Sequence, residues 1–594
     1  MNKRKICLNC IMGIMILLFS FIQLEISQNA DNIFQFMRMK NLYKALNLFT
    51  IMSIIIIFTV ILRKYWLATL FYSLLSFIIS IVNYYMVQFH GMPLSYLELK
   101  NFSTAMNVID IAAFQIDMRI ILFSILFIIN IVLSFFIKSQ EVKLSFKCKV
   151  WLHIVGVVTI CSVLFWGYLS NHSIKPHKTI TWSWQEGYYH YGYVACTIES
   201  VLQSSNVVEK PEGYSIDKVK ALKLEQQNVK QIEIKPDIIL ILNESFFDLR
   251  QIADIKTNIS YMDYIDNLKS IKGYAIVPGV GGMTNSSEYE LLTSNSLQLM
   301  KGITPFNVLD LHNANSIVSV LEQSGYYTYG MHPCPGLNYS RERGYLELGF
   351  DEIYFKEDFQ HLRELESRPF ETDKSCYENL IRWYEENDSD GTPKFMYMLT
   401  IQNHADWYYN SQDENEVQVL NDFGEKTDMV SEYLTCMKES NEALEMLLEY
   451  FSSVDRPVIV CMVGDHCPYL AEDVIKESYS EEEKKLLLRA APFVIWSNYG
   501  NIDYQNMGYV SLSYLSPILL DVAGVNMSPY YQYILSLKNE VPVITGYNTY
   551  FDKEGKVHMY TEQTHYSQIV NDYFALEYNN IDSPNRIQEY FECR

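Results

Sequence analysis

Five apolar runs at the start of the chain constrain its fold more than any other feature of the sequence. They cover roughly residues 6–24, 47–62, 66–88, 119–137 and 150–170, and each approaches the ~20 residues that a helix needs to cross a bilayer. The first run follows Met1-Asn-Lys-Arg-Lys, as in a signal peptide, but no A-x-A cleavage site follows, which favours an uncleaved helix. We therefore predict a transmembrane anchor of five helices over residues 1–170.

The distribution of basic residues between these runs predicts the orientation of the anchor, because cytoplasmic loops are enriched in Lys and Arg. The loop of residues 89–118 holds more acidic than basic residues, whereas residues 25–46 oppose the trend with three basic side chains. The segments expected in the cytoplasm carry Lys3, Arg4, Lys5, Arg63, Lys64, Lys138, Lys143, Lys147 and Lys149. We predict a cytoplasmic N-terminus, so that five crossings place everything after residue 170 outside the cell.

The net charge differs sharply between the two parts of the chain. The sequence holds 47 Lys and Arg against 69 Asp and Glu, a formal charge of −22. Residues 1–170 contain fourteen basic and six acidic residues, so residues 171–594 carry a charge of about −30. A strongly acidic domain is a poor nucleic-acid binder, because phosphate neutralisation needs a basic face. We expect no nucleic-acid partner.

Residues 171–235 lie between the apolar runs and the globular part and are predicted to form a juxtamembrane linker. The first two thirds of this segment are rich in Trp and Tyr, for example Trp182, Trp184, Tyr189 and Tyr193. Such rings favour the membrane–water interface, but they would equally suit packing against the globular domain. The sequence leaves both interpretations open.

From residue 236 to residue 594, short apolar runs rich in β-formers alternate with helical stretches. Amphipathic helices are expected over 428–451 and 510–523. The expected strands are Ile238–Leu242, Gly273–Val277, Tyr327–Gly330, Phe395–Thr400, Val458–Val463 and Phe493–Trp496. Continuous apolar strands separated by helices predict an α/β domain with a buried, mostly parallel sheet.

Four of these strands end at residues that can bind a metal ion or transfer a proton. The residues that follow them are Glu244, His332, His404 and the pair Asp465-His466. In a parallel α/β sheet, ligands bind beyond the carboxyl ends of the strands. One histidine at a strand end is ordinary, but four strands with such endings predict a functional site at this edge.

Asp465-His466, directly after Gly464, is the sharpest of these features. A carboxylate beside an imidazole offers oxygen and nitrogen donors, which suits Mn²⁺ or Zn²⁺ better than the all-oxygen shells of Mg²⁺ or Ca²⁺. The alternative is a turn capped by Asp465 with an exposed His466.

The segment Val280-Gly-Gly-Met-Thr-Asn-Ser-Ser-Glu provides a candidate nucleophile in Thr284. Gly281 and Gly282 permit a sharp bend and close backbone approach, after which a helix can begin with its N–H groups facing an anion. The following Asn and Ser residues are good capping types. A hydroxyl needs a metal ion or a base for activation, so without metal residues nearby Thr284 would be a simple N-cap.

Two arginines shortly after His332 could grip a phosphate group. Arg341 and Arg343 lie in the run Asn338-Tyr-Ser-Arg-Glu-Arg-Gly-Tyr. The planar guanidinium matches phosphate oxygens, although a surface salt bridge is an equally good interpretation from composition alone.

Taken in order, these motifs resemble lipoteichoic acid synthase, a sulfatase-like phosphoglycerol transferase of the alkaline phosphatase superfamily. The resemblance is strongest over 236–500 and weakest over 530–594. It rests on Asn243-Glu244-Ser245, Gly282-Met-Thr284-Asn-Ser-Ser-Glu288-Tyr, His332 with Asn338-Tyr-Ser-Arg341, Asn403-His404 and Gly464-Asp465-His466. A five-span anchor followed by an extracellular catalytic domain matches this family as well.

The resemblance implies a role for each of these residues. Glu244, Thr284, Asp465 and His466 would hold one divalent ion, Mn²⁺ by preference with Zn²⁺ and Mg²⁺ as alternatives, and Thr284 would also be the nucleophile. Arg341 would bind substrate, because its position matches that of the family's phosphate-gripping arginine. The position of Arg343 does not match it. The same implied substrate-binding set contains His332, Tyr339 and His404, and His404 is also the candidate for proton transfer. Tyr339 stands where these synthases carry Trp, and Met283 stands where they carry Lys.

The expected function is metal-dependent transfer of glycerol phosphate, through a phosphothreonine on Thr284. A phosphatidylglycerol-type lipid would be the donor, and lipoteichoic acid or a related cell-envelope polymer would be the acceptor. A sulfatase is disfavoured because neither Cys-x-Pro-x-Arg nor Ser-x-Pro-x-Arg occurs. The remaining alternatives are a phosphoethanolamine transferase of the same superfamily and a catalytically inactive membrane receptor.

Overall fold

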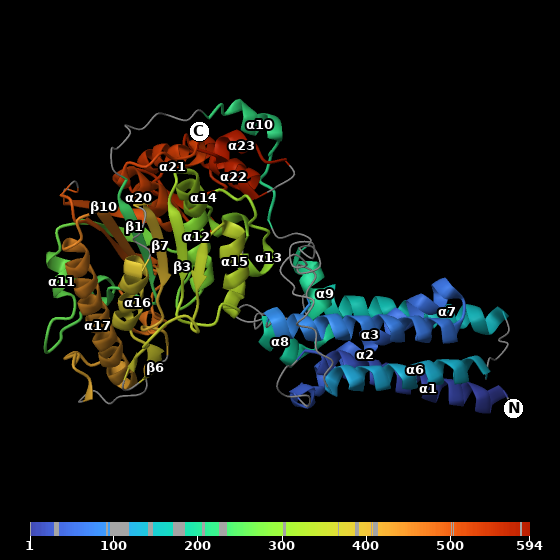
Figure 1. Cartoon of the computed structure of the whole chain (residues 1–594). Coiled ribbons are helices and arrows are strands. Elements are labelled where there is room, and N and C mark those ends of the chain that lie inside the picture. Colours follow the sequence, from blue (N-terminus) through green and yellow to red (C-terminus); the bar gives the residue numbers. More distant parts are fainter. Residues whose placement is uncertain are drawn as a thin grey trace. The chain divides into compact units, whose positions relative to one another are not determined.

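The computed structural model divides the chain into two compact units, Met1–Val207 and Val208–Arg594, each described here by itself (Figure 1). The structure describes residues 2–28, 35–90, 93–94, 118–139, 146–169, 184–204, 208–224, 235–300, 304–365, 368–386, 391–405, 407, 414–500, 502, 504–581 and 585–593.

The first unit is a bundle of long apolar helices. Among the described residues, four helices are long and apolar enough to cross a membrane: Arg4–Ile26, Asn41–Leu62, Tyr65–Val87 and Met118–Ser139. The helices of this unit are α1 (Asn2–Ile26), α2 (Asn41–Leu62), α3 (Tyr65–His90), α6 (Met118–Ser139), α7 (Phe146–Leu164), α8 (Trp184–Tyr191) and α9 (Tyr193–Ser204), with the 3₁₀ turn η1 (Gln35–Arg38) and the π-turn η3 (Phe165–Leu169).

The prediction of five spans is confirmed for four runs, and the side chains of the fifth run are described only over part of its length. The run expected over 150–170 coincides with α7 and η3, but its apolar stretch within the described side chains is Ile154–Tyr168.

Polar side chains join the anchor helices to one another. The Thr69 hydroxyl of α3 lies 3.1 Å from the Ser134 hydroxyl of α6, and Asn130 of α6 donates to Ser20 of α1 at 3.3 Å. Lipid around membrane helices removes most of the hydrophobic drive for their association. Hydrogen bonds of this kind and close packing therefore hold the helices together.

The aromatic residues before the second unit pack against the anchor helices. Tyr188 of α8 and Tyr193 of α9 are buried in one cluster with Ile51 and Tyr72. The ring of Tyr191 also meets that of Tyr43 of α2, with centroids 4.6 Å apart. The nearby residues 181–183, which include Trp182, lie outside the described part of the chain.

The second unit is built on an eight-stranded sheet with the order β10-β2-β9-β8-β1-β7-β3-β4. The strands are β1 (Asp237–Asn243), β2 (Ile271–Ile276), β3 (Tyr327–Met331), β4 (Glu352–Tyr354), β7 (Lys394–Leu399), β8 (Val458–Gly464), β9 (Ala490–Ser497) and β10 (Gln505–Ser511). Only β9 runs antiparallel to its neighbours within this sheet. The prediction of a mostly parallel α/β domain is therefore confirmed.

Helices cover both faces of the sheet, as expected for strands that are apolar throughout. Ile239 and Ile241 of the central strand β1 belong to one core cluster with Leu444 and Leu447 of α17 (Thr427–Ser452). α16 (Asp373–Glu386) lies beside α17, and α12 (Thr284–Thr293) and α14 (Ile317–Gln323) cover the opposite face (Figure 1).

The remaining elements surround this core. The other helices are α10 (Ile216–Ala221), α11 (Asp263–Asn267), α13 (Pro305–Val308), α15 (Arg341–Leu348), α18 (Ala471–Val474), α19 (Glu481–Leu487), α20 (Leu515–Ala523), α21 (Pro529–Glu540), α22 (Ser567–Ile581) and α23 (Gln588–Phe591). The small sheets comprise β5 (Glu364–Leu365) with β6 (Arg368–Glu371), and β11 (Val543–Ile544) with β12 (Thr549–Phe551) and β13 (Val557–Met559). The 3₁₀ turns are η4 (Leu249–Gln251), η5 (Leu297–Leu299), η6 (Asn338–Ser340), η8 (Gly424–Lys426) and η9 (Leu512–Tyr514).

All six expected strands are present, and α17 confirms the helix expected over 428–451. The helix expected over 510–523 is wrong at its start, because residues up to Ser511 belong to β10 and α20 begins only at Leu515. β10 is a largely exposed edge strand with a register shift between Asn506 and Tyr509, and Gly508 there adopts φ +64°. Such an irregular edge lacks the apolar alternation by which a strand is recognised.

Candidate active site at the carboxyl edge of the sheet

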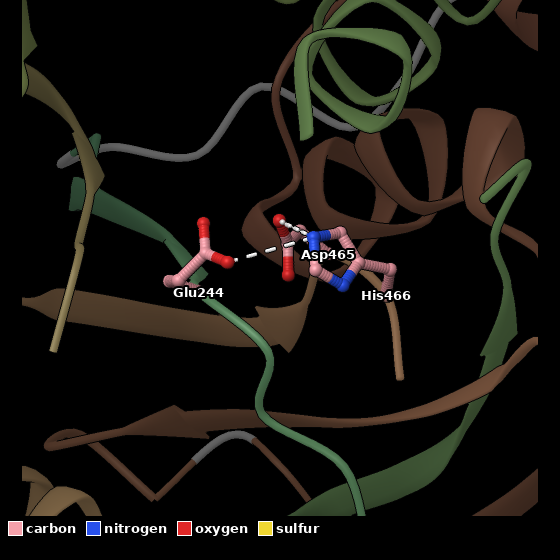
Figure 2. A group of neighbouring side chains, drawn as sticks. All are labelled: Glu244, Asp465 and His466. Carbon is pink, nitrogen blue, oxygen red and sulfur yellow. Dashed lines mark ion pairs between the residues drawn. The ribbon is translucent and has the colours of Figure 1, made fainter. Parts of the chain in front are cut away.

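The parallel pairing of β1 and β8 brings three predicted ligand residues together. Asn243 pairs with Gly464 in register, so the next residues, Glu244 and Asp465, leave adjacent strands at the same level. A Cβ atom on Gly464 would lie 1.9 Å from the carbonyl oxygen of Phe246, so only glycine fits this position. Figure 2 shows the Glu244 and Asp465 carboxylates and the His466 imidazole converging on one point.

The distances in this cluster are those of a preformed cation site. His466 Nε2 lies 3.2 Å from Asp465 Oδ2 and 3.5 Å from Glu244 Oε1, and one ligand atom from each residue lies within 4.8 Å of the others. All three side chains are buried. Asp465 Oδ2 has no hydrogen-bond partner, which is costly for a buried carboxylate oxygen. The donor set and this oxygen, which accepts no hydrogen bond, both fit a divalent metal ion.

The electrostatics of the cluster support the same conclusion. Burial and the neighbouring Glu244 raise the pKa of Asp465 to about 7. Burial disfavours the charged imidazole of His466, but Asp465 and Glu244 outweigh that effect and raise the pKa of His466. Two carboxylates buried side by side need a positive charge between them, and a bound cation would supply it.

Ser245 shapes the loop that presents Glu244. Its backbone adopts φ +48°, an unusual conformation for a residue other than glycine, and its N–H donates to Asp465 Oδ1 at 2.7 Å. Its hydroxyl donates to Glu244 Oε1 at 3.0 Å, and Tyr433 donates to its carbonyl at 2.8 Å. Strained residues that are held in this way cluster at functional sites.

Thr284 lies in hydrogen-bonding contact with the cluster. Its Oγ1 is 3.3 Å from both Glu244 Oε2 and His466 Nε2. Gly281 and Gly282 before it adopt φ +63° and +152°, and a Cβ on Gly281 would lie 2.9 Å from the Cα of Tyr469. The predicted glycine bend and the helix that begins after it are therefore both present, and α12 starts at Thr284 itself.

The capping of α12 differs from the prediction made from the sequence. Met283, in the left-handed conformation, precedes the helix and no side chain caps it. Ser287, which the sequence suggested as a capping type, instead donates to the carbonyl oxygen of Asp465 at 2.6 Å. This bond fixes α12 to the loop that carries Asp465 and His466, because the tertiary contact outcompetes the local cap.

A second group of residues surrounds Arg341 at the start of α15. The buried guanidinium donates from Nε to Glu288 Oε2 at 2.7 Å, and Tyr345 donates to Glu288 Oε1 at 2.5 Å. Arg341 Nη1 lies 3.4 Å from His332 Nε2, and its guanidinium sits 4.9 Å from the ring centre of Tyr339. The structure thus brings three predicted substrate-binding residues together: Arg341, His332 and Tyr339.

The protonation of His332 follows from its surroundings. Its Nδ1 lies 3.1 Å from the carbonyl oxygen of Leu399, so Nδ1 is the donor and Nε2 is left to accept from Arg341. Burial and the Arg341 charge hold the pKa of His332 well below its usual value. His332 is therefore a neutral support for the arginine.

The backbone before Arg341 is strained. Tyr339 and Ser340 have φ +58° and +55°, and the Ser340 hydroxyl donates to Asn307 at 2.9 Å. Arg343, in contrast, bonds to the carbonyl oxygen of Phe306 and lies 3.3 Å from Glu347. Of the two arginines that the sequence left open, Arg341 faces the candidate site and Arg343 supports α13.

His404 is exposed and lies five residues after the end of β7. Its Nδ1 is 2.8 Å from the carbonyl oxygen of Ala405, and its ring packs 5.3 Å from the ring of Phe370. It shares the sheet edge with His332, because β7 pairs with β3 up to Met331 and Met398.

The sequence did not predict the network of buried hydrogen bonds that lies beneath Glu244. Asn243 donates to Asp373 Oδ2 at 2.7 Å, Asn403 donates to Asn243 Oδ1 at 3.2 Å, and Ser440 donates to Asp373 at 2.7 Å. The Glu244 N–H donates to the Thr400 hydroxyl at 3.2 Å. Asn243 and Asn403 stand in the quoted motifs, but Asp373 and Ser440 lie in α16 and α17, where the sequence carries no signal for them.

Comparison with known proteins shows what the second unit is similar to. Residues 236–525, which lie in this unit, match the family model described as Sulfatase. The chain thus combines this unit with an N-terminal group of apolar helices.

Two relatives of known description resemble part of this chain. The chain is 27% identical over 364 residues to a protein of Rhizobium meliloti described as a cyclic beta-1,2-glucan modification protein, covering 59% of this chain and 55% of the relative. It is 23% identical over 240 residues to the capsular polysaccharide biosynthesis protein RkpI of the same species, covering 40% and 42%. The matches thus span about half the length of these curated relatives.

A solved structure shares the fold. The Streptococcus pyogenes phosphoglycerol transferase GacH, in complex with sn-glycerol-1-phosphate, matches 65% of this chain and 100% of its own chain. The identity is 19% and the TM-score is 0.53. The expected sulfatase-like α/β fold with a mostly parallel sheet is confirmed.

Proposed function

We propose that this chain is a membrane-anchored phosphoglycerol transferase that moves glycerol phosphate from a phosphatidylglycerol-type lipid to a cell-envelope acceptor. One observation carries the proposal: the Thr284 hydroxyl, at the start of α12, lies 3.3 Å from two residues of a buried cation-type site. The match to the Sulfatase family model and the GacH-like fold support the reaction class.

The proposed ligands of one divalent ion are Glu244, Asp465, His466 and the Thr284 hydroxyl. Such an ion, Mn²⁺ by preference with Zn²⁺ or Mg²⁺ as alternatives, would lower the pKa of the hydroxyl and offset phosphoryl charge. The mixed oxygen and nitrogen donors, and the lack of a hydrogen bond to Asp465 Oδ2, support this assignment.

The chain's own residues orient the reactants in two displacements. In the first, Thr284 Oγ forms a bond to phosphorus while the bond from phosphorus to the diacylglycerol oxygen breaks, and a proton passes to that oxygen. In the second, an acceptor hydroxyl bonds to phosphorus while the bond from phosphorus to Thr284 Oγ breaks, and the acceptor proton passes to Thr284 Oγ, which restores its hydroxyl. Arg341 would hold the phosphate oxygens, and the exposed His404, which follows β7, is the proposed carrier of a proton.

The same helix turn aligns the nucleophile with the phosphate-binding arginine. Thr284 and Glu288 are one turn apart on α12, and Glu288 holds Arg341 at 2.7 Å. Neighbours at this spacing lie on one helix face. Such positioning and electrostatic preorganisation account for most of the catalysis of phosphoryl transfer.

The proposed location of the catalytic domain is the outer side of the membrane, with residues 1–170 as anchor, 171–235 as linker and 236–594 as catalytic domain. The helix α7 contains 19 residues and η3 adds five. At about 1.5 Å per residue they span about 36 Å, which is enough to cross a bilayer. A fifth crossing of this kind places the domain opposite the N-terminus, near a lipid donor and the growing envelope polymer.

The acceptor class is proposed from chemistry and from the relatives. Two curated relatives bear names that refer to glucan modification and capsular polysaccharide biosynthesis. A hydroxyl of an envelope glycan or of a lipoteichoic acid chain fits the second displacement.

The test is to incubate the full-length chain with Mn²⁺ and phosphatidylglycerol and to analyse the peptides by mass spectrometry. A glycerol phosphate adduct on Thr284 is expected, together with released diacylglycerol. An ethanolamine phosphate adduct formed only from phosphatidylethanolamine would show the alternative transferase. The absence of any adduct and any released diacylglycerol would favour the inactive receptor.

A further inference from the structure

An ion pair between Lys356 and Glu371 lies at the same sheet edge as His332, one of the proposed substrate-binding residues. Tyr354, the last residue of β4, pairs in register with Met331, the last residue of β3, so His332 and Lys356 follow neighbouring strands at the same edge. The His332 N–H donates to the Tyr354 carbonyl at 3.0 Å, and the Lys356 N–H donates to the Cys334 carbonyl at 3.4 Å. The two loops are therefore joined by their backbones.

The pair is asymmetric in exposure. Lys356 Nζ lies 2.6 Å from Glu371 Oε1, and the lysine side chain is 49% exposed whereas the glutamate side chain is 5% exposed. The carboxylate is thus held inside the protein, and the lysine covers it from the solvent side. Removing the lysine would leave a buried carboxylate without its counter-charge.

Two contacts connect this pair with the residues of the candidate site. Glu371 directly follows Phe370, whose ring packs on that of His404. Cys334 follows His332 by two residues, and burial, followed by the charge of Glu371, raises the pKa of its thiol to about 12. Arg341, Lys356 and Glu244 also influence this thiol, so the ion pair and the candidate site share one electrostatic environment.

We propose, on the basis of the function proposed above, that the Lys356–Glu371 pair selects an uncharged polyol head group over an ethanolamine head group. The ammonium of ethanolamine phosphate would need an unneutralised carboxylate, but Glu371 is already neutralised and Lys356 repels a second cation. A glycerol hydroxyl carries no charge and can both donate to a carboxylate and accept from an ammonium. Discrimination thus arises from repulsion of the wrong ligand as well as attraction of the right one.

The experiment compares the affinities of two head groups for the full-length chain in detergent with Mn²⁺. Glycerol phosphate and phosphoethanolamine are titrated by calorimetry into the wild type and into Lys356→Met, Glu371→Gln and the double variant. The wild type is expected to prefer glycerol phosphate, and Lys356→Met to shift the ratio of the two dissociation constants roughly tenfold toward phosphoethanolamine. The double variant should lose that shift, because the freed carboxylate is gone.

A matched control removes an equivalent ion pair elsewhere. Lys426 Nζ lies 3.0 Å from Asp473 Oδ2 on the surface, so Lys426→Met should leave the ratio unchanged. A folded Lys356→Met protein with an unaltered ratio, or with no binding of either ligand, overturns the inference. These measurements need no turnover, so they are independent of the Thr284 adduct that tests the reaction itself.

Discussion

The two halves of the candidate site are organised in opposite ways. Around Arg341 the charge is balanced within the protein, since Glu288, Tyr345 and His332 all contact one another or the guanidinium. Around Asp465 the charge is unbalanced, since two carboxylates converge with one imidazole and Asp465 Oδ2 accepts no hydrogen bond. The arginine half is preorganised by the fold, whereas the carboxylate half is built to be completed by a cation.

The largest effect is expected at the junction of these halves, at Thr284. Thr284→Ala should reduce glycerol phosphate transfer by at least about 10³-fold, because removal of a nucleophile abolishes the covalent route. Transfer from a labelled lipid donor measures the loss. Thr284→Ser keeps a hydroxyl and should retain measurable transfer, so it serves as the control. Near-normal transfer by Thr284→Ala would refute the assignment of the nucleophile.

In the carboxylate half, Asp465→Asn should separate metal binding from folding. The wild type should gain about 2.7 kcal/mol of unfolding free energy at an Mn²⁺ concentration near one hundred times the dissociation constant, and the variant should lose most of this gain. Without metal the variant should be more stable than the wild type, because one of two buried like charges is removed. Thermal unfolding with and without a chelator measures both effects. Equal metal content in the two proteins would contradict the proposed ligand set.

In the arginine half, Glu288→Gln should behave in the opposite manner. It leaves the buried Arg341 charge without its carboxylate, so the free energy of unfolding should fall by about 3–5 kcal/mol even without metal. Added phosphate should recover part of this loss, because it supplies a new anion to the guanidinium, while the stabilisation by Mn²⁺ should persist. If Mn²⁺ stabilisation vanished instead, the two halves would not be independent.

The smallest effect is expected for Tyr345→Phe. This change removes one hydrogen bond to Glu288 and leaves the ion pair in place, so it should cost about 1 kcal/mol of stability. Transfer should change little, because Arg341 keeps its bond from Nε to Glu288. A loss of transfer as large as that of Glu288→Gln would show that the tyrosine, and not the ion pair, aligns the arginine.

Much of the fold and part of the candidate site could be predicted because both depend on local patterns. The apolar strands predict the parallel sheet, and the residues after β1, β3, β7 and β8 share its carboxyl edge. The edge strand β10 escaped prediction because its side chains are largely exposed and its register shifts at Gly508.

The sequence alone determined the residue types available for chemistry and the strands that carry them, because strand periodicity and glycine bends are local properties. Only the tertiary structure decided which of these residues meet. The pairing of Glu288 with Arg341, the support of Asn243 by Asp373, and the neutralisation of Glu371 by Lys356 join elements that are distant in the chain. Such contacts depend on strand order and on helix packing across the sheet, which no local pattern encodes.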